Sequence, residues 1–388
     1  MDRVETGASV EVRFLQFQLF SLIYLQKFAI GAADAQMSLP LILLVAGIAV
    51  MAARDRVMLS RLKTIAFAVF VSVVAISQFL ARGDVSVLSV LFLLVLYGCA
   101  IFRFTIDESD ARRLMDSFST LMLLPAAIVL FQFAFQKTTG LPNPLGMDRL
   151  MPPEVLLKGY IYEAPYPWGG TFSRPNGFFF LETSFASAFC AAAAIVELTH
   201  FRRIGRSVLF LGATAASLGG TGIGMLLIAL PFLAMRLAAP VVILTLAAGG
   251  VAIALGLLLG APLPMAARLA ELGIRDSSAF ERLIAPAHAL LALLGDPGHV
   301  FSGTGAGTVP SEAGSAWPAT KLVQEYGLAA LIAFEVFLLC GNAYAFNPAL
   351  IAALLVIYHF TGGYLLSPVM ALLVVLFCGT LAPTVTAR

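Results

Sequence analysis

Long apolar runs, separated by short polar stretches, fill most of this chain. A helix that crosses the hydrocarbon core of a bilayer needs about 20 apolar residues. Runs that approach or reach this length predict spans at 14–34, 37–53, 64–81, 85–102, 115–136, 177–199, 207–219, 220–235, 237–260, 322–342, 347–362 and 364–382. The pattern therefore predicts an all-α fold, a polytopic membrane bundle of about twelve transmembrane helices.

Composition supports lipid as the solvent of this chain. Hydrophobic residues make up 60% of the 388 positions and charged residues only 12%, whereas soluble domains carry about 25% charged residues. All four cysteines lie within apolar runs, which indicates small buried hydrophobes rather than a disulfide framework. The four histidines are scattered without metal-ligand spacing, so we expect no metal and no cofactor.

Three basic clusters predict the orientation of the spans. They lie at 54–63, 103–113 and 202–206, and short loops rich in Lys and Arg stay in the cytoplasm. Alternating the spans places these clusters and both termini inside. Two long segments then lie outside, on the periplasmic face in a Gram-negative cell. The expected units are a five-span bundle at 1–136, a first periplasmic loop at 137–176, central spans at 177–260, a second periplasmic segment at 261–321 and C-terminal spans at 322–388.

The stretch between Arg206 and Arg236 has two interpretations. Its 29 uncharged residues contain Gly219-Gly220-Thr221-Gly222, and one straight helix of that length would measure about 44 Å. We favour two half-helices broken near 219–222, because irregular backbone is tolerated where it lines a protein cavity. A single span would instead place every later segment on the opposite side.

The first outer segment ends in a charged stretch. Arg174 and Pro175 precede an apolar run that holds one carboxylate, Glu182, five residues into the predicted span. A carboxylate there needs a partner, which would be Arg174, another outer arginine or the substrate. Tyr166 and Trp168 lie just upstream and predict either an interfacial aromatic belt or a stacking surface for sugar rings.

The second outer segment contains a helical pattern between Phe280 and Leu294. Arg268, Arg275 and Arg282 recur every seven residues, so they would share one face if a helix continued through Gly273. Such a row suits phosphate oxygens, although a solvated face that pairs with neighbouring acids is the alternative.

A glycine-rich loop and a second carboxylate follow this helical pattern. Gly303 and Gly305 alternate with small residues, a pattern that lets backbone N–H groups close on an anion. Glu325 lies at the start of the next span, four residues after Lys321, and either takes part in the site or simply pairs with that lysine.

The ordered set of these motifs resembles the Wzy-type polysaccharide polymerases and the O-antigen ligases, which form one superfamily. The matching stretches are Arg174–Ser187, Ser217–Gly222, Gly303–Gly307 and Gln324–Gly327, within roughly residues 170–340. The resemblance implies a GT-C-like bundle in the bacterial inner membrane. It also implies metal-independent transfer of undecaprenyl-pyrophosphate-linked oligosaccharide repeat units at the outer face of that membrane. The partners that it implies are a flippase and a chain-length regulator, and nucleic acid is not among them.

Carried onto this chain, the resemblance assigns Arg174 and Arg282 to the pyrophosphate and Glu182 or Glu325 to the acceptor. Ligases carry a histidine shortly before the second carboxylate, whereas this chain reads Gly314-Ser315-Ala316-Trp317-Pro318, which favours a polymerase. A ligase that transfers glycan to lipid or protein, a transporter or flippase, and a membrane scaffold are the alternatives. A transporter would place ionisable residues near mid-membrane, but here they gather at the outer face.

Overall fold

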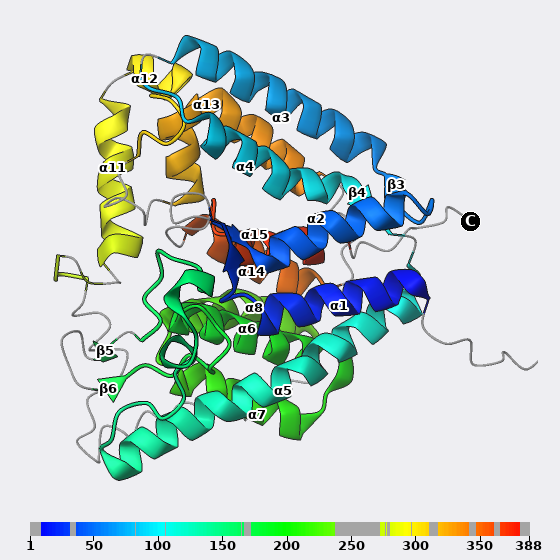
Figure 1. Cartoon of the computed structure of the whole chain (residues 1–388), viewed down its shortest axis with the longest axis vertical. Coiled ribbons are helices and arrows are strands. Elements are labelled where there is room, and N and C mark those ends of the chain that lie inside the picture. Colours follow the sequence, from blue (N-terminus) through cyan, green and yellow to red (C-terminus); the bar gives the residue numbers. More distant parts are fainter. Residues whose placement is uncertain are drawn as a thin grey trace, which may run out of the picture.

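A computed structural model of the chain shows a bundle of helices and, among the residues it describes, three two-stranded antiparallel sheets (Figure 1). The structure describes residues 9–31, 36–81, 83–104, 106–163, 165–166, 172–236, 272–275, 277, 280–295, 297–309, 317–340, 347–360 and 365–380. The predicted span at 237–260 lies outside these residues.

The helices follow the apolar runs closely. They are α1 (Val10–Tyr24), α2 (Leu39–Ala52), α3 (Arg61–Leu80), α4 (Val87–Gly98), α5 (Glu108–Thr139), α6 (Thr183–Val196), α7 (Ile204–Ala216), α8 (Gly220–Arg236), α11 (Ala285–Leu294), α12 (Pro297–Ser302), α13 (Pro318–Leu339), α14 (Pro348–Phe360) and α15 (Pro368–Val374). Short 3-10 turns occupy Cys99–Ile101, Met147–Arg149 and Pro153–Val155, and π-helical turns occupy Glu197–Phe201, Phe280–Ile284 and Val375–Thr380.

Among the described residues, four helices are long and apolar enough to cross a membrane. They are Arg61–Leu80, Glu108–Thr139, Thr183–Phe201 and Pro318–Leu339. The other apolar helices are shorter; α2, for example, has 14 residues, about 21 Å at 1.5 Å per residue. The hydrophobic core of a bilayer is about 30 Å thick, so these helices are shorter than the full spans that the hydropathy pattern predicts.

The first predicted span, 14–34, is wrong in its second half. Helix α1 ends at Tyr24, and Ala29–Ile30 (β1) pairs with Met37–Ser38 (β2) in a hairpin. Gln26 and Lys27 lie between them, and Gly31 turns the chain with a φ of 120°. The helix ends just before these two polar residues, and Gly31 then allows the turn between β1 and β2.

Helix α6 forms the centre of the bundle. Every residue of Thr183–Val196 is buried, and α6 packs against α5, α7 and α8. Ala191, Ala192, Ala193 and Ala194 let these neighbours approach closely, as small residues do in membrane helix packing.

The expected break between two half-helices is present. Helix α7 ends at Ala216, Leu218 has a φ of 56°, and α8 begins at Gly220. The Ser187 hydroxyl of α6 donates to the Gly219 carbonyl at 2.8 Å and accepts the Gly222 N–H at 3.0 Å. The break therefore fits against one serine of the central helix.

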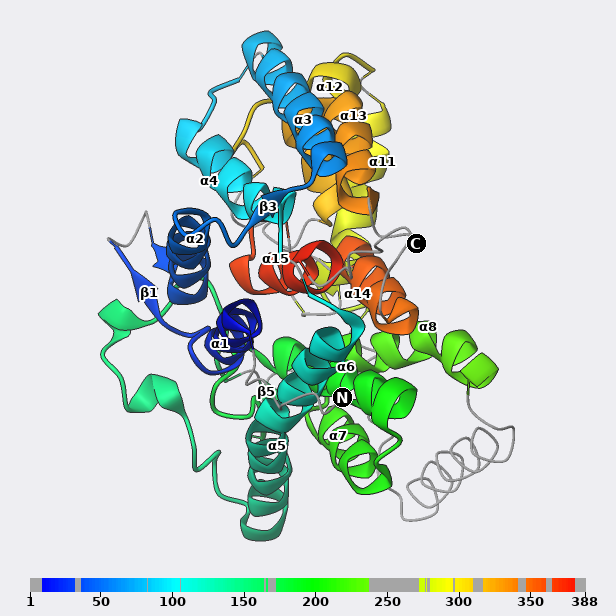
Figure 2. The ribbon, with the colours of Figure 1, turned by 90° about the vertical axis from the view of Figure 1, so that its right-hand side faces the viewer.

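The predicted basic clusters meet at one end of the bundle. Met58–Leu59 (β3) pairs with Phe102–Arg103 (β4), which joins the first two clusters. This end is at the right in Figure 1. In the third cluster, Arg203 contacts Asp116 near the start of α5 at 2.6 Å. Helices α11 and α12 and the hairpin of Pro165–Tyr166 (β5) with Phe172–Ser173 (β6) lie at the other end. Figure 2 gives the view from the end that holds the basic clusters.

Candidate functional site

An ion pair joins the two halves of the chain at the end of the bundle that carries α11. The Arg282 Nη2 atom lies 2.6 Å from Glu182 Oε2, and the two side chains are 24% and 16% exposed. The residues are 100 positions apart in the sequence. The expectation that Glu182 needs a partner is confirmed, and the partner is an arginine of the second outer segment.

Glu182 lies at the start of α6 rather than five residues inside a helix. Gly177 and Phe178 both have a φ of 67°, so the chain turns there and helical geometry begins only at Thr183. The Glu182 carboxylate accepts the Ile161 N–H and the Ser184 hydroxyl, each at 3.2 Å. The carboxylate is thus held at the start of α6, in contact with the first outer segment.

Arg282 is held in place from its backbone as well as its side chain. It lies in the π-helical turn that precedes α11, and its carbonyl accepts the Trp317 Nε1–H at 2.7 Å. Trp317 packs edge-on against Phe360 of α14. The start of α13 and the end of α14 therefore fix the position of the guanidinium beside Glu182.

Arg174 is buried, with only 2% of its surface exposed. Its guanidinium lies over the Tyr166 ring at 5.7 Å, so these two predicted residues meet. The strand that leads to Arg174 is clamped by Gln136 of α5, whose side chain accepts the Ser173 N–H and donates to the Ser173 carbonyl. Trp168 lies outside the described residues.

The predicted row of arginines on one helix face is not formed. Gly273 and Arg275 lie in turns, and Arg275 is exposed. Arg268 lies outside the described residues. Glycine weakens a helix, and of the two described arginines Arg282 lies in helical structure whereas Arg275 does not.

The glycine-rich loop does not present open N–H groups to an anion. Thr304 and Gly305 donate to the carbonyls of Gln324 and Glu325 at 2.7 and 3.2 Å, and Ala306 donates to the Gln78 side chain at 2.7 Å. Gly303 and Gly305 have φ values of 73° and 115°. Here the alternating glycines let the loop pack on α13, because a Cβ at Gly303 would lie 2.6 Å from Glu325 backbone atoms.

Glu325 pairs with Lys321, which was the alternative to a role in the site. Glu325 is fully buried, and its Oε1 lies 2.8 Å from the Lys321 ammonium. The Val309 N–H also approaches this oxygen at 3.4 Å. Two residues later, Gly327 leaves helical geometry with a φ of 81° and kinks α13. Glu325 thus belongs to the junction of α13 with the glycine-rich loop.

Lys27 is a buried cation that the sequence analysis missed. It is 0% exposed, and its Nζ has no hydrogen-bond partner among the described residues. The ammonium lies 5.0 Å from the centre of the Tyr162 ring. Burial lowers the pKa of Lys27 to about 8, although Asp148 and Glu163 act in the opposite direction. Its place within an apolar run was the only signal of this position.

The site can neutralise an anion and accept a proton in the same place. It offers a guanidinium and a carboxylate, both partly exposed, beside a segment rich in tyrosine. Within the described part of the chain, no group of three His, Cys, Asp or Glu residues is arranged to hold a metal ion.

No protein-family model matches the chain, and no curated protein matches it significantly. The fold and the site thus define a helical protein whose described part contains four helices able to cross a membrane and a charged site at one end of the bundle.

Proposed function

We propose that the chain is a membrane glycosyltransferase that polymerises undecaprenyl-pyrophosphate-linked oligosaccharide repeat units into a cell-surface polysaccharide. The observation that carries this proposal is the Glu182–Arg282 ion pair, which lies at the end of the bundle away from the basic clusters. Glu182 belongs to the stretch Arg174–Ser187, which resembles the polymerase and ligase superfamily, and the same resemblance assigns Arg282 to the pyrophosphate.

The proposed orientation follows from the charges at the two ends. About twelve spans cross the bacterial inner membrane, both termini are cytoplasmic, and segments 137–176 and 261–321 face the periplasm. The meeting of the 54–63 and 103–113 clusters through β3 and β4 supports this orientation, because positive charge near short loops marks the cytoplasmic side.

The proposed reaction is a displacement at a sugar carbon. A hydroxyl oxygen of the acceptor repeat unit attacks the anomeric carbon of the growing glycan, and the bond from that carbon to the pyrophosphate oxygen breaks. The hydroxyl proton passes to the Glu182 carboxylate. Arg282 stabilises the negative charge of the departing undecaprenyl pyrophosphate, since a guanidinium fork suits phosphate oxygens.

The ion pair is the resting arrangement of these two groups. When pyrophosphate binds, Arg282 exchanges the Glu182 carboxylate for phosphate oxygens, and the carboxylate becomes available as a base. Arg174 is buried over the Tyr166 ring, and its cation–π contact stabilises the end of the first outer segment.

Variants in cells that lack the chromosomal gene test the proposal. We expect Glu182→Gln and Arg282→Gln to abolish polymer and to cause accumulation of single lipid-linked repeat units, while the proteins still reach the membrane. Lipid-linked intermediates are measured by mass spectrometry after extraction.

Glu163→Gln is the matched control. It breaks another outer carboxylate–arginine pair, Glu163–Arg149 at 2.5 Å, and should leave polymer length unchanged. Normal polymer in both Glu182→Gln and Arg282→Gln would contradict the proposed roles. Finished long chains that remain on the carrier would point to ligation instead of polymerisation.

A further inference from the structure

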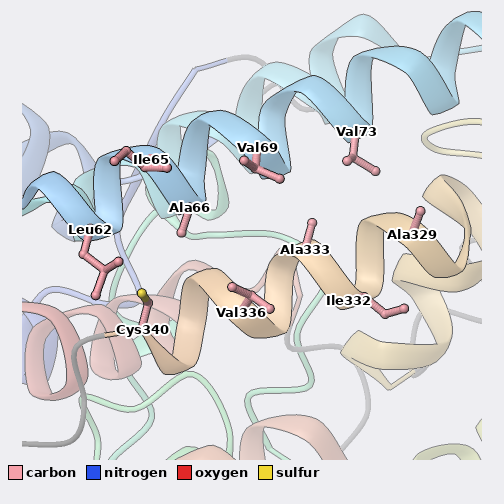
Figure 3. A pocket seen from close by; sticks show the side chains of 10 residues that line it. All are labelled: Leu62, Ile65, Ala66, Val69, Val73, Ala329, Ile332, Ala333, Val336 and Cys340. Carbon is pink, nitrogen blue, oxygen red and sulfur yellow. The ribbon is translucent and has the colours of Figure 1, made fainter.

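An apolar groove runs between α3 and α13 (Figure 3). Its volume is about 500 Å³, and its lining residues are Leu62, Ile65, Ala66, Val69, Val73, Ala329, Ile332, Ala333, Val336 and Cys340. Alanines on both helices make the hollow. Both helices are long and apolar enough to cross a membrane, so the groove would open to the hydrocarbon of the bilayer.

The groove follows the length of α3 and α13. Helices α3 and α13 run antiparallel, with Phe67 beside Phe337 and Phe70 beside Phe334. Gln78, near the outer end of α3, donates to the Glu325 carbonyl at 3.0 Å. From Gln78 to Leu62 the helix rises about 24 Å at 1.5 Å per residue. The midplane lies about 15 Å below the surface of a 30 Å core, so the groove continues past it.

Helix α13 connects the groove to the candidate site. Lys321 and Glu325 form their ion pair close to Gln78. Trp317, four residues before Lys321, donates to the Arg282 carbonyl at 2.7 Å. Helix α13 thus lines the groove from Ala329 onward and, at its start, contacts the arginine of the candidate site.

We propose that this groove holds the polyprenyl chain of the lipid-linked substrate, with the phosphate end directed toward Lys321 and Arg282. This inference rests on the proposed function. The lining carries no polar side chain except the Cys340 thiol, which suits a purely hydrocarbon ligand. A phospholipid tail anchored at the outer surface ends near the midplane, whereas a polyprenyl chain is long enough to follow the groove beyond it.

A photoreactive polyprenyl phosphate, with a diazirine in its hydrocarbon chain, tests this assignment. The whole protein is reconstituted in phospholipid nanodiscs, illuminated with the probe and digested for mass spectrometry. We expect the label on the peptides that contain Val69, Val73, Ala329 and Ile332. Unlabelled undecaprenyl phosphate should compete, and added phosphatidylglycerol should not. Equal competition by phosphatidylglycerol would show an ordinary acyl-chain groove and overturn the assignment.

Two exposed alanines provide a matched pair of variants. Ala329 lines the groove, while Ala68 of α3 faces away from it, and both are exposed. Ala329→Phe should reduce labelling about tenfold because the ring fills space that the ligand needs, and Ala68→Phe should leave labelling unchanged. Equal labelling of the two variants would overturn the inference.

Labelling of the groove requires no glycosyl transfer. The groove and the proposed reaction can therefore be rejected independently of each other. Specific labelling together with normal polymer in Glu182→Gln would reject the proposed reaction alone. Loss of polymer in Glu182→Gln together with labelling that ignores Ala329→Phe would reject the groove alone.

Discussion

At the scale of single residues, Glu182 and Lys27 are two charged groups that differ in exposure and in pairing. Glu182 remains partly exposed and meets Arg282 at 2.6 Å, so its charge is compensated. Lys27 is fully buried, and its ammonium has an aromatic ring but no hydrogen-bond partner among the described residues. Burying an unpaired charge is costly, so Lys27 should destabilise the folded state.

Replacing Lys27 should therefore stabilise the protein. Below a pH of about 8 the lysine is protonated in the folded and in the unfolded state. The free energy of folding then includes the full cost of burying the ammonium. Between about 8 and its ordinary pKa of 10.5, only the unfolded state binds the proton, so stability rises with pH. Lys27→Met should remove this rise and add about 3 kcal/mol at pH 7.

Thermal unfolding in detergent at pH 7 and pH 9.5 measures the effect. Lys158→Met is the control. Lys158 is exposed and follows Leu157, whose N–H donates to the Lys27 carbonyl at 2.8 Å, so this variant should change neither the melting temperature nor its dependence on pH. A lower melting temperature for Lys27→Met at pH 7 would show that the ammonium is stabilising.

The sequence was sufficient to predict that Glu182 has a cationic partner, because a lone carboxylate in an apolar run is unstable. It could not select Arg282 over Arg174, since that choice depends on how the turn at Phe280–Ile284 meets the start of α6. It also could not show that the amides around Gly303 and Gly305 are already occupied. Their acceptors come from α3 and α13, far away in the sequence.

At the scale of elements, glycines set where the helices break and how closely they pack. A Cβ on Gly222 would lie 2.2 Å from the Ser187 carbonyl oxygen, whereas a Cβ on Gly220 would have nothing within 4 Å. The break between α7 and α8 could be predicted from Gly219–Gly222, because a 29-residue helix is too long for the bilayer. The early end of α1 could not, because apolar residues continue beyond Tyr24.

The two glycines at the start of α8 should respond differently to alanine. We expect Gly222→Ala to destabilise the protein by about 2 kcal/mol or more, since a packed core does not admit the added methyl group. Gly220→Ala should be neutral or stabilise by less than about 1 kcal/mol. Melting curves in detergent compare the two, and equal melting temperatures would mean that α8 does not pack on Ser187 as described.

At the scale of the whole molecule, the candidate site and the basic clusters lie at opposite ends of the bundle. Glu182, Arg282 and the Lys321–Glu325 pair lie toward the end with α11 and α12, and the basic clusters gather at the end with β3 and β4. Hydropathy alone predicts the number of apolar segments, but several of the helices are too short to count as full spans. The orientation of the bundle therefore needs a direct measurement.

Single cysteines in a variant without native cysteines report this orientation. Lys158, Leu294 and Ser109 are all exposed. Cysteine at 158 and 294 should react with an impermeant thiol reagent in intact spheroplasts, and cysteine at 109 only after lysis. Labelling of 294 only after lysis would mean that the second segment is cytoplasmic and that Arg282 cannot meet Glu182 at the outer face.

Reconstitution of the purified protein tests the central claim most directly. The protein is placed in proteoliposomes with lipid-linked repeat units extracted from a strain that lacks the gene, and the products are separated by size. The account predicts a ladder of longer lipid-linked glycans, one undecaprenyl pyrophosphate released for each unit added, and neither product with Glu182→Gln. If the repeat units cross the membrane but never lengthen, the chain is a flippase and the proposed chemistry is wrong.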